Sequence, residues 1–130
     1  MRYKYYLSAT GSQSEIHALA EYLNVTGSKV EQLRSAHLSN NLAGSDKWIW
    51  RSPYYDCKGD FPEDELLEFL RKNADLVEKL KERPEGIQDM VAVLVGKIGD
   101  GDEPNGYSIS NDLITYLAEI RASLEIDVVR

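Results

Sequence analysis

The chain has 130 residues, of which 42% are hydrophobic and 28% charged, with a net charge of −7 and one cysteine. This length and composition predict one globular domain over residues 1–130 that buries its own core, and they exclude a disulfide-stapled miniprotein. A single cysteine cannot form an internal disulfide, so a reducing, cytoplasmic setting is expected. No run approaches the roughly 20 apolar residues that cross a bilayer, so no membrane partner is predicted.

The charges are divided unevenly between the two halves of the chain. Residues 1–58 carry a net charge of +2, whereas residues 59–130 carry −9. A protein that binds nucleic acid needs a clustered basic surface, which this distribution excludes. An acidic half favours basic partners, although the same charges also serve simply to keep a domain soluble.

The first segments predict a strand followed by a helix. Residues 2–10 alternate between two sets of side chains, as in a strand with one buried face. The next residues, SQSE, form a capping box in which Ser12 and Glu15 each bond the other residue's backbone amide. Apolar residues then recur at the spacing of one helix face: Ile16, Leu19, Ala20 and Leu23.

Two short strands are predicted in the next third of the chain. The first covers residues 29–33 and is followed by a polar loop over residues 35–46. The second runs from Trp48 to Trp50, and Pro53 ends its pairing because proline has no N–H to donate.

The strongest helical pattern predicts one continuous helix over residues 62–81. Pro62 suits the first turn, and the acidic residues 63–65 complement the positive end of the helix dipole. Pro84 and Gly86 then stop the helix. The apolar stripe of this helix consists of Leu66, Leu70, Ala74, Val77 and Leu80. The cations near its C-terminal end are Lys79, Lys81 and Arg83.

The last third predicts a strand, an acidic loop, a helix and a final strand. Residues 89–98 are apolar on both faces, which indicates a central strand covered on two sides. After the loop at residues 99–106, Ser110 caps a helix with Leu113, Ile114, Leu117 and Ile120 inward. The closing strand, SLEIDVV, places Leu124, Ile126 and Val128 on one face.

The order of these elements predicts the fold class. The first six are strand, helix, strand, strand, helix and strand, which is the βαββαβ order of ferredoxin-like folds. An additional C-terminal αβ unit follows. Three helices on one sheet therefore predict an α+β domain built as a two-layer sandwich.

Four stretches resemble the domain-of-unknown-function family 4279, a family of uncharacterised small bacterial proteins. They are YKYYLSATG, WIWRS, PEDELLEFLRKNADLVEKLKER and GYSISNDLITYLAEIRASLEIDVV. The resemblance covers most of the chain but involves mainly core and capping positions, so it implies a fold more than an activity. It supplies no catalytic residues. The matching positions of the last stretch are Gly106, Ser108, Ser110, Leu113, Leu117, Ala118, Leu124, Ile126 and Asp127.

The residues predict neither a metal site nor a cofactor, and no catalytic residue is assigned. The acidic stretch from Asp100 fails the calcium-loop pattern at its fifth, sixth and twelfth positions. His17, His37 and Cys57 lack the spacing of zinc ligands. Cys57 is the one candidate nucleophile, but no family signature surrounds it, so an unreactive loop thiol is expected.

The segment KWIWRSPYYDC, residues 47–57, is the candidate site. If Ile49 packs under the helices, Trp48 and Trp50 lie on the second face of the sheet, where Tyr6 can join them. In the alternative arrangement both tryptophans enter the core and Ile49 points outward. The first arrangement suits a protein partner, because Trp, Tyr and Arg dominate interface hot spots, and it equally suits packing against a loop or another copy of the chain. The predicted partner-binding residues are Tyr6, Trp48, Trp50, Arg51, Tyr54 and Tyr55.

Three functions are compatible with these features. The leading hypothesis is a non-catalytic protein-binding module, such as a bacterial immunity-type inhibitor whose acidic half docks a basic toxin. The alternative is a small-molecule binder or enzyme with a pocket near residues 35–58 and His37 as its base. The third is a domain that works by self-association.

Overall fold

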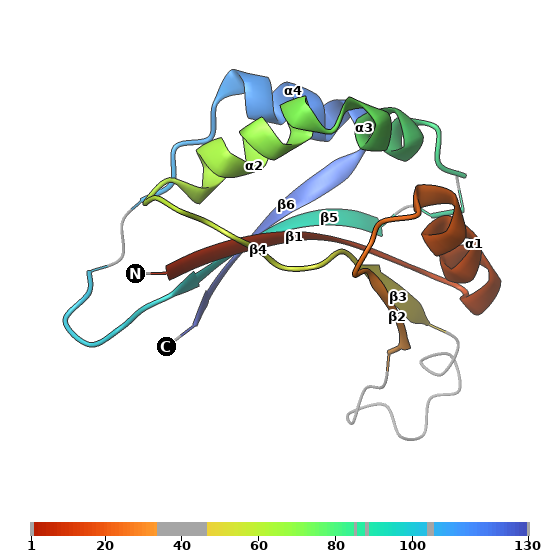
Figure 1. The fold of residues 1–130 in the computed structure, drawn as a ribbon, viewed down its shortest axis with the longest axis horizontal. Coiled ribbons are helices and arrows are strands. Elements are labelled where there is room, and N and C mark those ends of the chain that lie inside the picture. Colours follow the sequence, from red (N-terminus) through yellow and green to blue (C-terminus); the bar gives the residue numbers. More distant parts are fainter. Residues whose placement is uncertain (1, 34–46, 85, 88, 104–105, 130) are drawn as a thin grey trace.

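The computed structural model describes residues 2–33, 47–84, 86–87, 89–103 and 106–129. Four helices lie on one face of an open, six-stranded mixed sheet, so the described elements form two layers and the α+β class is confirmed (Figure 1). In chain order the elements are β1 (Arg2–Gly11), α1 (Gln13–Leu23), β2 (Lys29–Gln32), β3 (Trp48–Arg51), β4 (Tyr55–Asp56), α2 (Pro62–Lys72), α3 (Ala74–Lys81), β5 (Asp89–Lys97), α4 (Asn111–Glu119) and β6 (Ala122–Val129).

The long strands β1 and β5 form the centre of the sheet. The strand order is β2-β3-β1-β5-β6, and β4 pairs with β1 on the same side as β3. All these pairs are antiparallel except β5 with β6, which run parallel and are joined through α4. A parallel pair needs such a crossover, since its strands start at the same end of the sheet.

Ser52 and Pro53 interrupt the ladder between β1 and the segment that contains β3 and β4. The Ser52 amide donates to the Leu7 carbonyl at 2.9 Å, and the Leu7 amide donates to the Ser52 hydroxyl at 2.9 Å. The hydroxyl therefore replaces a carbonyl acceptor where proline breaks the regular pairing. The prediction that Pro53 ends the pairing of this strand is confirmed, and pairing resumes at Tyr55.

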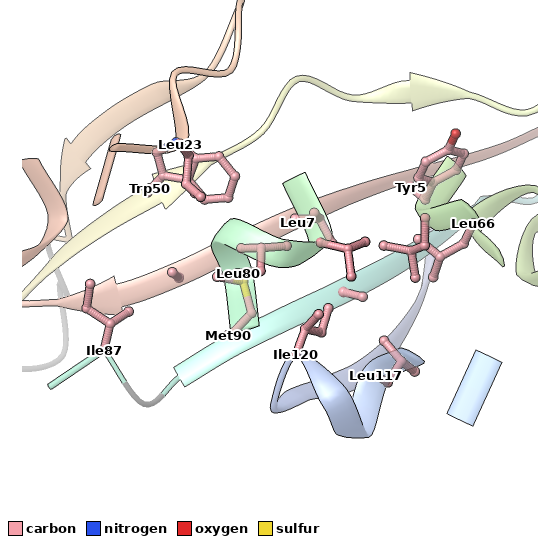
Figure 2. Close-up of a cluster of buried hydrophobic side chains, with 14 of the residues drawn as sticks. Tyr5, Leu7, Leu23, Trp50, Leu66, Leu80, Ile87, Met90, Leu117 and Ile120 are labelled. Carbon is pink, nitrogen blue, oxygen red and sulfur yellow. The ribbon is translucent and has the colours of Figure 1, made fainter. Parts of the chain in front are cut away.

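The core lies between the sheet and the helices (Figure 2). The inward face predicted for β1 is confirmed, because Tyr3, Tyr5, Leu7 and Ala9 are all buried, and Ser8 of the other face is buried as well. Trp50 is completely buried among them, with Leu23 from α1 drawn beside it in Figure 2. Burial of these side chains is the main stabilising contribution, at roughly 25 cal/mol per Å² of apolar surface.

Two predicted helix starts are confirmed by their hydrogen bonds. Glu15 donates its amide to the Ser12 hydroxyl at 3.3 Å, while the Ser12 amide donates to the Glu15 carboxylate at 3.0 Å. Ser110 accepts from the amide of Leu113 at 3.2 Å. Each bond satisfies an amide that has no partner within its own helix.

The prediction of one continuous helix over residues 62–81 is wrong, because Asn73 separates α2 from α3. Its backbone leaves the helical region, with φ −116° and ψ 55°. Its side-chain amide donates to the Phe69 carbonyl at 2.7 Å, and this bond helps to terminate α2. The apolar spacing of the sequence does not reveal this break.

Two predictions about burial are also wrong. Ile114 is 51% exposed, since Leu113, Leu117 and Ile120 already fill the inward side of α4. β5 is not covered on two sides by the described elements, because all four helices lie on one face (Figure 1). Among the described residues, no helix combines the length and the apolar character needed to span a membrane.

Candidate functional site

The sheet face away from the helices is the candidate site, and we name it the open face. Residues paired across neighbouring strands share a face, so the register identifies its members. Val93 stands between Tyr6 and Glu125 in this register. It is only 3% exposed, so neighbouring side chains shield it. The open face comprises Arg2, Lys4, Tyr6, Ser8 and Thr10 of β1, Lys29 and Glu31 of β2, Ile49 and Arg51 of β3, Asp56 of β4, Asp89, Val91, Val93, Val95 and Lys97 of β5, and Ser123, Glu125, Asp127 and Val129 of β6.

A tyrosine pair projects from the middle of the open face. The rings of Tyr6 and Tyr54 pack edge to face, with centroids 4.8 Å apart and planes at 62°. Tyr54 is 53% exposed, whereas Tyr6 is half-buried beneath it. The pair therefore presents a rigid aromatic ring to solvent on an apolar base, which is the composition of a binding hot spot.

Two cations flank the tyrosine pair, and each already has an anionic partner. The Lys4 ammonium lies 5.9 Å from the Tyr54 ring centroid and 3.8 Å from the Asp56 carboxylate. The Arg51 guanidinium lies 6.0 Å from the Tyr6 centroid and 3.3 Å from the Glu31 carboxylate. The positive charge around the aromatic pair is thus largely neutralised by these neighbours.

The acids of β6 lack such partners. Within the part of the chain that the structure describes, neither Glu125 nor Asp127 forms an ion pair. Burial raises the pKa of the Tyr6 phenol, with Tyr54, Glu125 and Asp127 acting in the same direction and Arg51 opposing them. Glu125 and Asp127 therefore place two carboxylates without contact ion pairs on this side of the open face, and Lys97 of β5 lies on the same face.

The six predicted partner-binding residues do not form one surface. Tyr6, Arg51 and Tyr54 lie on the open face. Trp48 and Tyr55 are half-buried against the core, with Tyr55 stacked on Tyr5 at 5.2 Å between ring centroids. The sixth residue, Trp50, is 0% exposed.

The arrangement with both tryptophans on the second face is therefore wrong. Ile49 pairs with Thr10 and lies on the open face, while Trp50 pairs with Ala9 and faces the helices. Trp50 cannot contact a partner from there. Period-two alternation offers both solutions, and the large apolar area of tryptophan decides between them in favour of burial.

The acids of β6 were not predicted as site residues, although the sequence contains their signal. The stretch LEIDVV alternates apolar and acidic side chains, which indicates a strand with an acidic face. What the pattern alone does not give is the neighbour relation, namely that Glu125 pairs with Val93 and lies one strand from Tyr6.

The pocket predicted near residues 35–58 falls partly outside the described residues, as does His37. A separate groove of about 430 Å³ lies between α2, α3 and α4. Ion pairs lie along it, Arg71 with Asp112 at 2.7 Å and Lys81 with Glu119 at 3.3 Å. The charged side chains of this groove are therefore already paired with one another among the described residues.

Metal ligation and nucleophilic catalysis find little support in the described ranges. No group of three or more His, Cys, Asp and Glu residues there is placed to hold a metal ion. His17 is exposed, and its Nδ1 lies 2.8 Å from the Gln13 carbonyl. Burial, followed by Glu65, raises the pKa of the Cys57 thiol to about 12, which suppresses the reactive thiolate.

Comparison with known proteins gives no match to a family model, a curated protein or a solved structure. The resemblance to family 4279 therefore stays a prediction. The geometry and charge of the open face remain the basis for a functional hypothesis.

Proposed function

We propose that this protein is a non-catalytic cytoplasmic module that binds a basic protein partner through its open face, in the manner of an immunity-type inhibitor. One observation carries the proposal: Glu125 and Asp127, which form no ion pair with a described residue, share with the exposed ring of Tyr54 a sheet face that none of the described helices covers. The resemblance to an uncharacterised family neither adds nor removes a function.

The two parts of this surface contribute different terms to binding. The ring of Tyr54 offers apolar area and a hydroxyl at little cost in conformational entropy, which is typical of hot spots. Glu125 and Asp127 attract a basic surface and accelerate its association, an effect that salt weakens. The valines of β5 provide an apolar floor between these groups.

The first experiment measures binding to the proteins encoded next to this gene, by calorimetry at low and high salt. The wild type is expected to bind one basic neighbour, and Tyr54→Ala to weaken that binding about 10-fold or more. Tyr22→Ala is the matched control, because Tyr22 is 40% exposed on α1, in the helix layer. The control is expected to bind like the wild type.

Two results would contradict the proposal. The first is the absence of a complex with any basic neighbour at low salt. The second is a complex whose affinity responds equally to Tyr54→Ala and Tyr22→Ala, since that would separate binding from the open face.

The proposed ferredoxin-like core is supported by the strand directions. β2 and β1 are both antiparallel to β3, which lies between them, so β1, α1 and β2 resemble a split βαβ unit. β3 and β5 are likewise both antiparallel to β1, which lies between them. Because α2 and α3 lie in the connection from β3 to β5, these elements resemble a second split βαβ unit. The unit formed by α4 and β6 then corresponds to the predicted C-terminal addition.

A further inference from the structure

We infer that β6 binds an extended segment of the basic partner, which pairs with its free edge as an additional strand of the sheet. This inference rests on the proposed function. β6 ends the sheet, and no described strand pairs with its outer side. An edge strand presents a row of unpaired backbone donors and acceptors, which is the recognition surface used in β-strand addition.

One hydrogen bond fixes which backbone groups of β6 face outward. The amide of Ile98 donates to the carbonyl of Val129 at 2.9 Å, so Val129 directs its backbone groups toward β5. The amide and carbonyl of one strand residue point to the same side, and they alternate from residue to residue. Leu124, Ile126 and Val128 therefore direct their amides and carbonyls toward the free edge.

The side chains of β6 define the sequence that an added strand needs. Ile126 and Val128 lie on the helix side of the sheet and are 42% and 46% exposed, which leaves apolar area for a neighbour. Glu125 and Asp127 lie on the open face, and neither forms an ion pair with another described residue. Directly opposed side chains interact across strands, so the matching segment alternates apolar residues with Lys or Arg.

The opposite edge of the sheet lacks these features. β2 has only four residues, and Lys29 and Glu31 are both exposed on it. A very short edge strand is protected against strand addition, because it offers few unpaired backbone groups. The contrast marks β6, with eight residues, as the receptive edge.

Charge also disfavours the antiparallel pairs of two β6 strands that overlap most, whereas it favours a basic segment. An antiparallel β6–β6 pair centred on Ile126 places Glu125 of one copy opposite Asp127 of the other. Pairs centred on Glu125 or Asp127 place identical carboxylates face to face. Like charges in these positions are destabilising, whereas a lysine or arginine there is attracted.

The test uses a capped, fluorescently labelled eight-residue peptide of alternating Lys and Val, equal in length to β6. It is expected to bind the wild type and to slow hydrogen exchange at the amides of Ile126 and Val128. A peptide with the same residues in two blocks is the composition control. It is expected to bind about 10-fold more weakly, because its lysines and valines cannot face opposite sides.

Two variants separate backbone pairing from simple charge attraction. Ile126→Pro deletes an outward amide without removing a bond to β5, and proline is tolerated at such edge positions. It is expected to weaken peptide binding about 10-fold or more. Ile126→Ala keeps the amide and is expected to weaken peptide binding by a smaller factor. If Ile126→Pro fails to fold, Val128→Pro, which deletes the other outward amide of this stretch, provides the second test, with a similar loss of peptide binding expected.

Several results would overturn the inference. They are equal binding of the alternating and block peptides, exchange protection on elements other than β6, and a wild-type dimer that protects β6 without any peptide. If a basic partner binds and depends on Tyr54 but not on the amide of Ile126, the inference fails while the proposed function stands. If no basic partner binds at all, the proposed function fails as well.

Discussion

The thiol of Cys57 shows how local structure sets the chemistry of one residue. Its amide donates to the Tyr3 carbonyl at 2.9 Å, which holds Cys57 beside the first strand. The Glu65 carboxylate accepts the amides of Lys58 at 2.9 Å and of Gly59 at 3.1 Å. A fixed anion thus stands next to a half-buried thiol, and both burial and this charge disfavour the thiolate.

We predict that Cys57 reacts slowly with iodoacetamide. A pKa of about 12 leaves a thiolate fraction at pH 8 about a thousandfold below that of an unperturbed cysteine. Glu65→Gln removes a negative charge, lowers the pKa of the thiol and is expected to speed alkylation. Glu68→Gln, on the exposed side of α2, is the control. Alkylation of the folded wild type as fast as that of the urea-unfolded chain would contradict the prediction.

At the scale of elements, Arg83 connects the ends of two helices. Only 3% of this residue is exposed, and its guanidinium donates to the carbonyls of Leu80 and Ile120, at the C-terminal ends of α3 and α4. It also donates to the carbonyls of Ile87 at 3.1 Å and Arg121 at 2.9 Å. The charge therefore lies where both helix dipoles are negative, and it satisfies carbonyls that helix ends leave free.

We predict that Arg83→Met lowers the free energy of unfolding by about 3 kcal/mol, because it leaves buried carbonyl groups without a hydrogen-bond donor. Arg83→Lys restores the charge but not the planar fork of donors, so it is expected to recover less than half of the loss. Lys72→Met, at an exposed position, is expected to change stability by less than about 0.5 kcal/mol. Urea unfolding followed by circular dichroism measures all three. Equal effects of Arg83→Met and Lys72→Met would contradict this role.

The elements differ in how well the sequence predicts them. The capping serines and the alternation in β1 act through neighbours along the chain, so Ser12, Ser110 and the buried face of β1 were predicted. The break at Asn73 was not predicted, because apolar spacing continues through it and only a side-chain hydrogen bond to Phe69 marks it. Arg83 was predicted as a cation that suits a helix C-terminus. Its bonds to Ile120 and Arg121 depend on contacts between residues far apart in sequence.

At the scale of the whole molecule, the same distinction applies to the candidate site. Composition and element order predicted an α+β domain, because both reflect how apolar residues are distributed along the chain. The orientation of the Trp48–Arg51 strand was left open, since a shift of one residue exchanges its two faces. The pairing of β6 with β5, which brings Glu125 next to Val93, follows from the packing of the complete sheet.

Burial of aromatic side chains gives the folded molecule a characteristic response to alkali. Burial raises the pKa of Tyr5 to about 12, and it also raises the pKa of Tyr3, Tyr6, Tyr55 and Tyr107. An unfolded chain releases its phenol protons near pH 10. Above that pH the folded state therefore binds more protons than the unfolded state, and stability falls as pH rises.

We predict that the contribution of the buried tyrosines and of Cys57 to the free energy of unfolding is nearly constant from pH 7 to 8. Between pH 9 and 12 this contribution declines steeply. Each proton retained only by the folded state contributes a slope of about 1.4 kcal/mol per pH unit. The thiol of Cys57 begins this decline, because its unfolded pKa is near 8.5 and its folded pKa is about 12. Tyr5→Phe and Cys57→Ser each remove one such proton and are expected to make the slope shallower. Urea unfolding across this pH range, with tyrosinate absorbance as the titration signal, measures the effect. A stability that stays level up to pH 11, or a Tyr5→Phe slope equal to that of the wild type, would show that these side chains titrate alike in the folded and unfolded states.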